Sequence, residues 1–201
     1  MNKLLRDVKL INKYSQEMGG VFSTGDLHRL FGQDTPVLLY RRIRTLEGAG
    51  ILTRFSRGFY VTTDFNREAL CGRVNTNSYI SFGTILAKEL MIGSTPTTTV
   101  YAVKTGKKRE YQGAGLTIVY MGISQNLFFG YDVKNGVRLA TAEKALLDTL
   151  FFYQQGYSFS FNIYEDIDTT QLDQDIIFKW LKYYRNPRFI SFVKGYLSDR
   201  S

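Results

Sequence analysis

Residues 35–61, TPVLLYRRIRTLEGAGILTRFSRGFYV, predict a basic helix that a β-hairpin follows directly. Thr35 followed by Pro36 is typical of a helix start, because proline is favoured at the first helical position. Apolar residues then recur at the spacing of one helical face, and glycines close the helix: Leu39, Ile43, Leu46, Gly48 and Gly50. Residues 51–55 and 59–61 are rich in β-forming side chains and flank a turn with glycine, which predicts the hairpin.

Two shorter helical patterns precede this segment. The first is amphipathic and ends at Gly19, and the second begins at Ser23 or Thr24 and ends at Gly32. Three helices, the third followed by a hairpin with an arginine at its tip, are the layout of a winged helix-turn-helix, whose third helix enters the major groove of DNA. We therefore expect a winged helix-turn-helix DNA-binding domain over residues 1–64.

The outward face of the third helix carries the candidate DNA contacts. At 100° per residue, the apolar side chains point inward and the arginines point outward or flank that face. Arginine binds guanine edges or phosphates through two hydrogen bonds, and small side chains can touch thymine methyl groups. The expected DNA-binding residues are Val37, Arg41, Arg42, Arg44, Thr45, Arg54 and Arg57. The alternative is a basic face that is only solvated.

The second half of the chain changes from helical to strand periodicity. Helices are predicted around residues 67–74 and from Ser81 to Leu90. Strands are predicted at residues 99–103, 116–121, 127–133 and 137–140, with Asn135–Gly136 as a hairpin turn. Three more helices follow, the first capped by Thr141. Residues 65–201 should thus form a mixed α/β domain, which makes the fold class of the chain α+β.

Composition narrows the classes of function. The 201 residues are 44% hydrophobic, as in a globular protein, and a net charge of +8 favours a polyanionic partner such as double-stranded DNA. One cysteine and one histidine cannot complete a four-ligand zinc site, which argues against structural zinc. We expect no bound metal and no other cofactor. No secretory signal and no apolar stretch of about 20 residues is visible, which predicts a cytoplasmic protein without a membrane partner.

One enzyme class remains open at this point, a metal-dependent nuclease. Such a site needs clustered carboxylates and a lysine near a sheet edge, and the candidates are Glu110, Asp132 and Lys134. The segment around Asp132 is also typical of a solvated hairpin end. We therefore expect a protein that is not an enzyme.

Several segments of the sequence resemble a known protein family. They are residues 20–60, residues 79–81, residues 127–131 and the block LATAEKALLD at residues 139–148. Together they resemble the AbiE-type antitoxins (AbiEi), over about residues 15–155. The family usually has proline where Ala142 stands, and the aromatic-rich tail beyond Gly156 matches less well.

The resemblance implies a role in a type IV toxin–antitoxin system. Members of the family repress their own operon through the winged helix, while the C-terminal domain counteracts a nucleotidyltransferase-like toxin without a stable complex. The signature residues carried over are Glu143, Lys144, Leu147 and Asp148, which from the sequence pattern alone form a capped amphipathic helix. The alternatives are a stand-alone winged-helix transcriptional regulator, whose second domain senses a ligand or dimerises, and the nuclease.

Overall fold

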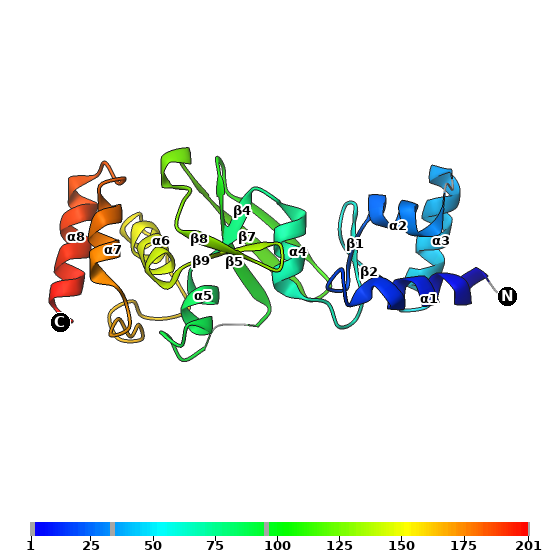
Figure 1. The fold of residues 1–201 in the computed structure, drawn as a ribbon, viewed down its shortest axis with the longest axis horizontal. Helices are drawn as coiled ribbons and strands as arrows, with labels where there is room; N and C mark the ends of the chain where they lie inside the picture. The colour runs from blue at the N-terminus through cyan, green and yellow to red at the C-terminus, as the bar shows by residue number, and fades with distance from the viewer. Residues whose placement is uncertain (1–2, 33–34, 95–96, 201) are drawn as a thin grey trace. The chain divides into compact units, whose positions relative to one another are not determined.

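The computed structural model describes residues 3–32, 35–94 and 97–200 and shows a mixed α+β chain (Figure 1). This confirms the predicted α+β class. The chain divides into an N-terminal unit, Met1–Thr76 with Tyr111–Thr117, and a C-terminal unit, Asn77–Glu110 with Ile118–Ser201. Every helix in the described part of the chain is too short or too polar to cross a lipid bilayer.

The N-terminal unit packs four helices around a three-stranded antiparallel sheet. In chain order its elements are α1 (Lys3–Ser15), β1 (Val21–Ser23), α2 (Thr24–Phe31), α3 (Pro36–Gly48), β2 (Thr53–Ser56), β3 (Phe59–Val61) and α4 (Arg67–Val74). The strand order is β1-β3-β2. The three predicted helices and the hairpin are present, and β1 is an addition that is too short to show a period of two in the sequence.

Local capping explains where the helices of this unit begin. Ser23 caps α2 and forms a capping box with Asp26, in which each side chain accepts from the other's backbone N–H. Thr35 caps α3, because its hydroxyl oxygen accepts a hydrogen bond from the Leu38 N–H at 3.4 Å, and Pro36 occupies the first turn. The local sequence therefore determines where both helices begin.

Helix α4 extends the N-terminal unit beyond the boundary at residue 64 that the sequence suggests. The Asn66 N–H donates to the Gly19 carbonyl at 2.8 Å, and Leu70 and Cys71 on α4 are buried. Arg73 forms an ion pair with Asp26. These contacts are long-range, which is why local sequence placed the boundary too early.

A six-stranded sheet of order β6-β7-β5-β4-β9-β8 forms the centre of the C-terminal unit, and most of this sheet belongs to that unit. The strands of this sheet are β4 (Ser78–Ile80), β5 (Thr99–Thr105), β6 (Arg109–Gly113), β7 (Leu116–Ile123), β8 (Tyr131–Lys134) and β9 (Val137–Ala140). Residues 111–117, at the turn between β6 and β7, are grouped with the N-terminal unit. The helices of the C-terminal unit are α5 (Gly83–Lys88), the 3-10 turn η1 (Gln125–Leu127), α6 (Ala142–Gln154), α7 (Gln174–Leu181) and α8 (Pro187–Ser198). Strand β4 pairs with β5 antiparallel and with β9 parallel.

Two local predictions in this unit are wrong. The strand expected at residues 127–133 begins only at Tyr131, because Gly130 has a φ of 73° and interrupts the extended backbone. Ser81 does not cap α5, which has Phe82 at its N-cap without a side-chain cap bond. The Ser81 hydroxyl instead donates to the Asp148 carboxylate at 2.8 Å.

Helix α6 is the centre of the C-terminal helical layer. Thr141 caps it as predicted, accepting from the Lys144 N–H at 3.3 Å. Its residues from Lys144 to Leu150 are all buried, and both α7 and α8 pack against it. Figure 1 shows α7 and α8 side by side at the C-terminal end of the chain.

Candidate nucleic-acid interface

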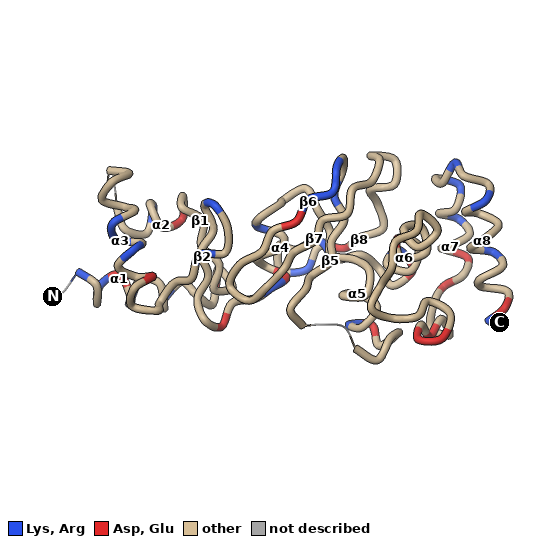
Figure 2. The backbone as a smooth tube through the Cα atoms, turned by 180° about the vertical axis from the view of Figure 1, so that it is seen from behind, with Lys and Arg blue, Asp and Glu red and all other residues tan. Residues whose placement is uncertain are grey.

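The outward face of α3 gathers most of the predicted DNA-binding residues. Leu39, Ile43 and Leu46 are buried in the core of the N-terminal unit, which turns the opposite face of the helix to solvent. Val37 is 78% exposed. Residues at intervals of three and four share a helix face, so Val37, Arg41 and Arg44 form one ridge. Figure 2 shows the basic residues along α3.

Thr45 lies beside this ridge with its polar atom already engaged. Its hydroxyl donates to the Arg41 carbonyl at 3.0 Å, one turn back along α3. The methyl group is then the part of the side chain that remains for an apolar contact. This is the group that a thymine methyl contact requires.

Arg42 does not join the exposed face, which corrects the sequence-based expectation. Only 9% of its side chain is exposed, and its Nε donates to Asp7 Oδ2 at 2.9 Å. A second bond joins Nη2 to the other Asp7 oxygen, and Nη1 donates to the Phe31 carbonyl at 2.9 Å. Its guanidinium lies over the Phe31 ring, 4.2 Å from the centroid. Arg42 thus fastens α3 to α1 and to the end of α2.

The hairpin supplies the remaining two arginines. Arg54 on β2 and Arg57 in the turn are both exposed. The turn is fastened to the start of α2, because the Thr24 N–H donates to the Gly58 carbonyl at 2.8 Å. Gly58 has a φ of 83°, a conformation that favours glycine at the tip. Arg57 is therefore presented from a turn that the body of the unit holds in place.

Tyr40 is an exposed residue on α3 that the sequence pattern did not single out. Nearly half of its side chain is exposed, and it flanks the ridge of Val37 and Arg44. Its hydroxyl can donate or accept a hydrogen bond. In the sequence, only its position three residues after Val37 indicated that it shares the exposed side of the helix.

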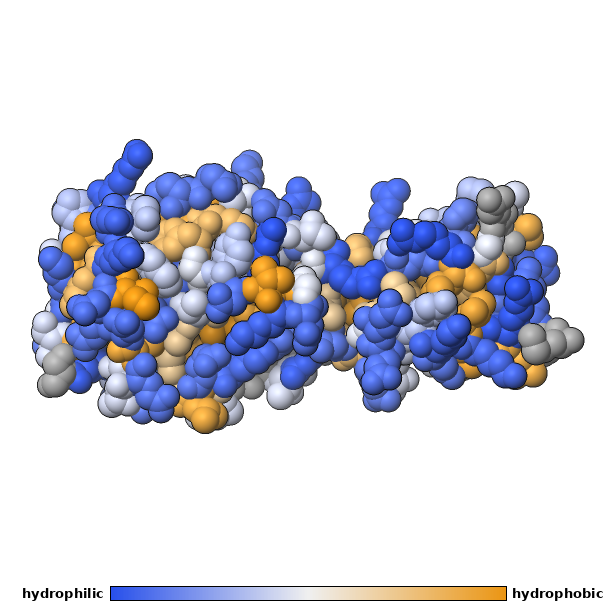
Figure 3. Space-filling view, in the orientation of Figure 1, coloured by the Kyte–Doolittle hydropathy of each residue, from blue (hydrophilic) through white to orange (hydrophobic). Residues whose placement is uncertain are grey.

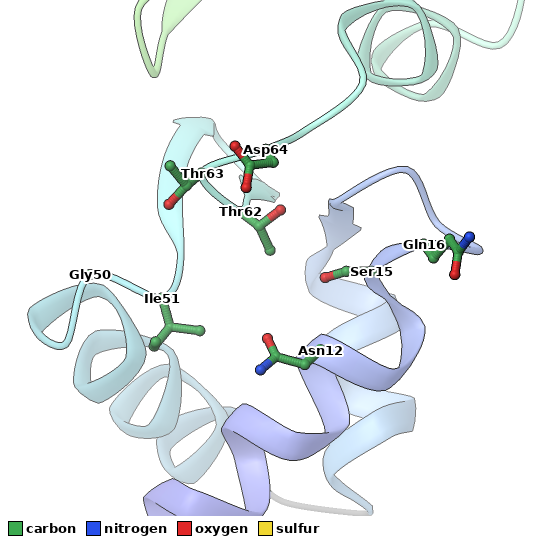
Figure 4. Close-up of a pocket in the computed structure, with 8 residues that line it drawn as sticks. All are labelled: Asn12, Ser15, Gln16, Gly50, Ile51, Thr62, Thr63 and Asp64. Carbon is green, nitrogen blue, oxygen red and sulfur yellow. The ribbon is translucent and has the colours of Figure 1, made fainter.

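A separate hollow of about 380 Å³ lies in the N-terminal unit, between the end of α1 and the residues around β2 and β3. Figure 4 shows Asn12 and Ser15 of α1 facing Ile51 and Thr62 across it. The described residues that line it are uncharged except for Asp64. The hollow lacks the positive charge of the α3 face and adds nothing to a phosphate-binding surface.

In the C-terminal unit, three of the four signature residues are interior. Lys144 and Leu147 are fully buried, and Asp148 is 1% exposed. Glu143 is partly exposed and accepts a bond from the Asp173 N–H at 3.4 Å, next to the start of α7. A partner molecule can therefore reach Glu143, but not the polar ends of Lys144 and Asp148.

Lys144 and Asp148 form a buried polar network. Lys144 Nζ lies 2.5 Å from Asp148 Oδ1 and donates to the Tyr184 hydroxyl at 3.2 Å. The Tyr79 hydroxyl donates to Asp148 Oδ2 at 3.0 Å, beside the bond from Ser81. Every charged oxygen of the carboxylate therefore has a donor, as a buried charge requires.

Burial perturbs the titratable groups of this network. It lowers the pKa of the Lys144 ammonium below its ordinary value, although the Asp148 carboxylate opposes this effect. Burial and the neighbouring Asp148 charge raise the pKa of Tyr79 and of Tyr184. Both phenols therefore stay protonated, and Tyr79 serves as a donor to the carboxylate. The network joins α6 to β4 and to the segment that follows α7.

The residues considered for a nuclease do not come together. Glu110 lies on β6, whereas Asp132 and Lys134 lie on β8, and these strands are the two opposite edges of the sheet. Five strand spacings of about 4.8 Å separate such edges by roughly 24 Å. Among the described residues, no group of three or more histidine, cysteine, aspartate or glutamate side chains is placed to hold a metal ion.

By its fold this is a mixed α+β protein of two compact units, the first of which presents a basic helix face. Comparison with models of known protein families and with curated proteins finds no match. Among solved structures, it is similar to the crystal structure of the Rv2827c protein from Mycobacterium tuberculosis, with a TM-score of 0.58 and 13% sequence identity. The match covers 90% of this chain and 71% of that chain. At this identity the similarity shows a shared fold.

Proposed function

We propose that the N-terminal unit is a winged helix-turn-helix that binds double-stranded DNA and represses transcription of its own operon. The observation that carries the proposal is the exposed ridge of Val37, Arg41 and Arg44 on α3, in the same unit as the exposed Arg57 of the hairpin turn. A helix of this kind fits the major groove, and the hairpin arginine reaches the backbone or the minor groove. The net charge of +8 supports the same partner.

Salt dependence tests the DNA-binding part. The full chain is titrated with a duplex that covers the region upstream of its own gene and with a random duplex of equal length. If on the order of 4 to 6 phosphates are contacted, log K falls against log salt with a slope of about −4 to −5. An affinity that does not change with salt contradicts the proposal.

We further propose that the C-terminal unit acts as an antitoxin against a nucleotidyltransferase-like toxin, without a stable complex. The support is the sequence resemblance in residues 139–148, of which only Glu143 offers a charged group at the surface. Growth of cells that express the toxin encoded beside this gene, with and without this protein, tests the role. Unchanged toxicity, or the absence of such a neighbouring gene, favours a stand-alone regulator.

A further inference from the structure

A second site lies in the C-terminal unit, apart from the DNA-binding residues. A pocket of about 510 Å³ opens between η1, the end of α6 and the turn that joins α7 to α8. Its size lies within the range of roughly 300–1,000 Å³ that is usual for small-molecule sites. No residue of the Lys144 network except Tyr184 lines it. We propose that this pocket binds a nucleoside monophosphate, either free or as the end of a single strand.

The walls of the pocket provide surfaces on which a base can stack. Phe151, Tyr183 and Tyr184 line it, and the Tyr183 side chain is 42% exposed. The Tyr183 ring packs against Phe129 at a centroid distance of 4.8 Å, and the Lys182 Nζ lies 5.4 Å from its centroid. An exposed aromatic ring with a fixed orientation stacks on any base at little entropic cost.

Amide side chains around the pocket can read the edge of a base. Asn126 Nδ2 donates to the Tyr183 carbonyl at 3.1 Å, and Gln155 Nε2 donates to the Phe151 carbonyl at 3.1 Å. Asn186 Oδ1 accepts from the first turn of α8. Each amide thus engages one atom, and among the described residues its other atom has no hydrogen-bond partner: an acceptor oxygen in Asn126 and Gln155, and a donor NH2 in Asn186. The pocket therefore offers both an acceptor for the donor groups of a base edge and a donor for its acceptor groups.

The phosphate has a cationic partner in the same wall. Arg185 is exposed, and among the described residues that line the pocket it is the one with a charge. It belongs to a segment, residues 176–198, with five lysines and arginines and no aspartate or glutamate. Figure 3 shows hydrophilic side chains interspersed with apolar ones over α7 and α8. Arginine can bind a phosphate through two hydrogen bonds, and beside stacking rings it favours a phosphorylated base over a neutral ligand or a simple anion.

The single tryptophan of the chain provides an intrinsic fluorescence probe of binding. Trp180 is the single tryptophan of the chain, and its ring centroid lies 5.4 Å from that of Phe129, which contacts Tyr183. The full chain is titrated with adenosine 5′-monophosphate and with uridine 5′-monophosphate, by tryptophan fluorescence and by calorimetry. We expect saturable binding, with adenosine alone and inorganic phosphate alone each binding at least tenfold more weakly.

Matched variants assign the binding to this pocket. Arg185→Gln and Tyr183→Ala should each weaken nucleotide binding about tenfold. Lys194→Gln, which removes the same charge from an exposed position on α8 outside the pocket, should leave it unchanged. All three should bind the upstream duplex as the parent does, so a failure here is distinguishable from a failure of DNA binding by α3.

A short single-stranded oligonucleotide with a 5′-phosphate distinguishes the two sources. Tighter binding of the oligonucleotide than of the mononucleotide, lost in Arg185→Gln, identifies a strand end as the ligand, whereas the reverse order identifies a free nucleotide. The proposal is overturned if neither binds at millimolar concentration. It is also overturned if inorganic phosphate binds as well as the nucleotides, or if Arg185→Gln and Tyr183→Ala leave nucleotide binding intact.

Discussion

Neighbouring arginines on α3 have opposite roles. Arg41 faces solvent on the ridge with Val37, whereas Arg42 is turned inward by one helical step of about 100° and meets Asp7. The two residues are adjacent and of the same type, so only the packing of α1 against α3 makes one of them exposed and the other buried. Substitutions at the two positions should therefore have different consequences.

Arg41→Ala is expected to weaken binding to the specific duplex by about 1 to 3 kcal/mol and to relax its base preference, because a bidentate contact to a base edge is lost. Fluorescence anisotropy with specific and random duplexes measures both effects. Lys194→Ala, the same loss of charge in the C-terminal unit, is the control and should change neither. Equal losses on the two duplexes would instead make Arg41 a phosphate contact.

Arg42→Met is expected to destabilise the N-terminal unit by about 3 to 5 kcal/mol, because it leaves the Asp7 carboxylate buried without its partner. Urea unfolding of the full chain measures the loss. The double variant with Asp7→Leu removes both charges and should recover much of it. Full stability of Arg42→Met with a selective loss of DNA binding would show that Arg42 contacts DNA after all.

At the scale of the element, α6 holds a cation and an anion one turn apart inside the protein. Lys144 and Asp148 are at i and i+4, which is the spacing of neighbouring side chains on a helix. The close approach of Gly130 to the Lys144 stem, where an added Cβ would lie 3.0 Å from Lys144 Cγ, shows how tightly the pair is enclosed. Removing either partner of such a buried pair leaves the other charge uncompensated.

A double-mutant cycle measures this coupling. Lys144→Met and Asp148→Asn should each destabilise the C-terminal unit by about 3 to 5 kcal/mol, because each leaves the other charge uncompensated. The double variant should lose less than the sum of the two, by up to about 3 kcal/mol. Urea unfolding at constant pH is the measurement. Strictly additive losses would mean that the two charges do not stabilise each other.

At the scale of the whole molecule, the chain consists of two compact units, and α4 belongs to the first. Asp26 shows how α4 is attached. Burial by itself raises the pKa of this carboxyl, but hydrogen bonds from Ser23 and Arg29 and the charge of Arg73 outweigh it and hold the pKa below its ordinary value. The capping of α2 and the docking of α4 thus use the same carboxylate.

A fragment of residues 1–76 should therefore be more stable than a fragment of residues 1–64. The shorter piece loses the Asn66–Gly19 bond, the Arg73–Asp26 pair and the buried Leu70. Fully burying a leucine contributes about 1.5 to 3 kcal/mol, and in so small a domain each kcal/mol moves Tm by roughly 4–8 °C. Thermal unfolding followed by circular dichroism compares the two. Equal Tm values would place α4 outside the cooperative unit.

Helix starts and faces were predictable from short stretches of sequence, because capping and amphipathic spacing are local properties. Thr35, Pro36 and the apolar residues of α3 illustrate this, as does Thr141 at the start of α6. The α+β class and the exposed position of Val37 followed from the same patterns. Three-residue strands such as β1 and β4 did not, since they are too short to show a period.

Everything that depends on a partner distant in the sequence was decided by the tertiary structure. Arg42 is separated from Asp7 by 35 residues and Asp148 from Tyr79 by 69, so no local pattern distinguishes these side chains from solvated ones. The pocket beside Arg185 joins η1, α6 and the α7–α8 turn, which are also remote from one another in the chain. A charge is buried only where packing brings it donors or an opposite charge, and that pairing is a property of the folded chain.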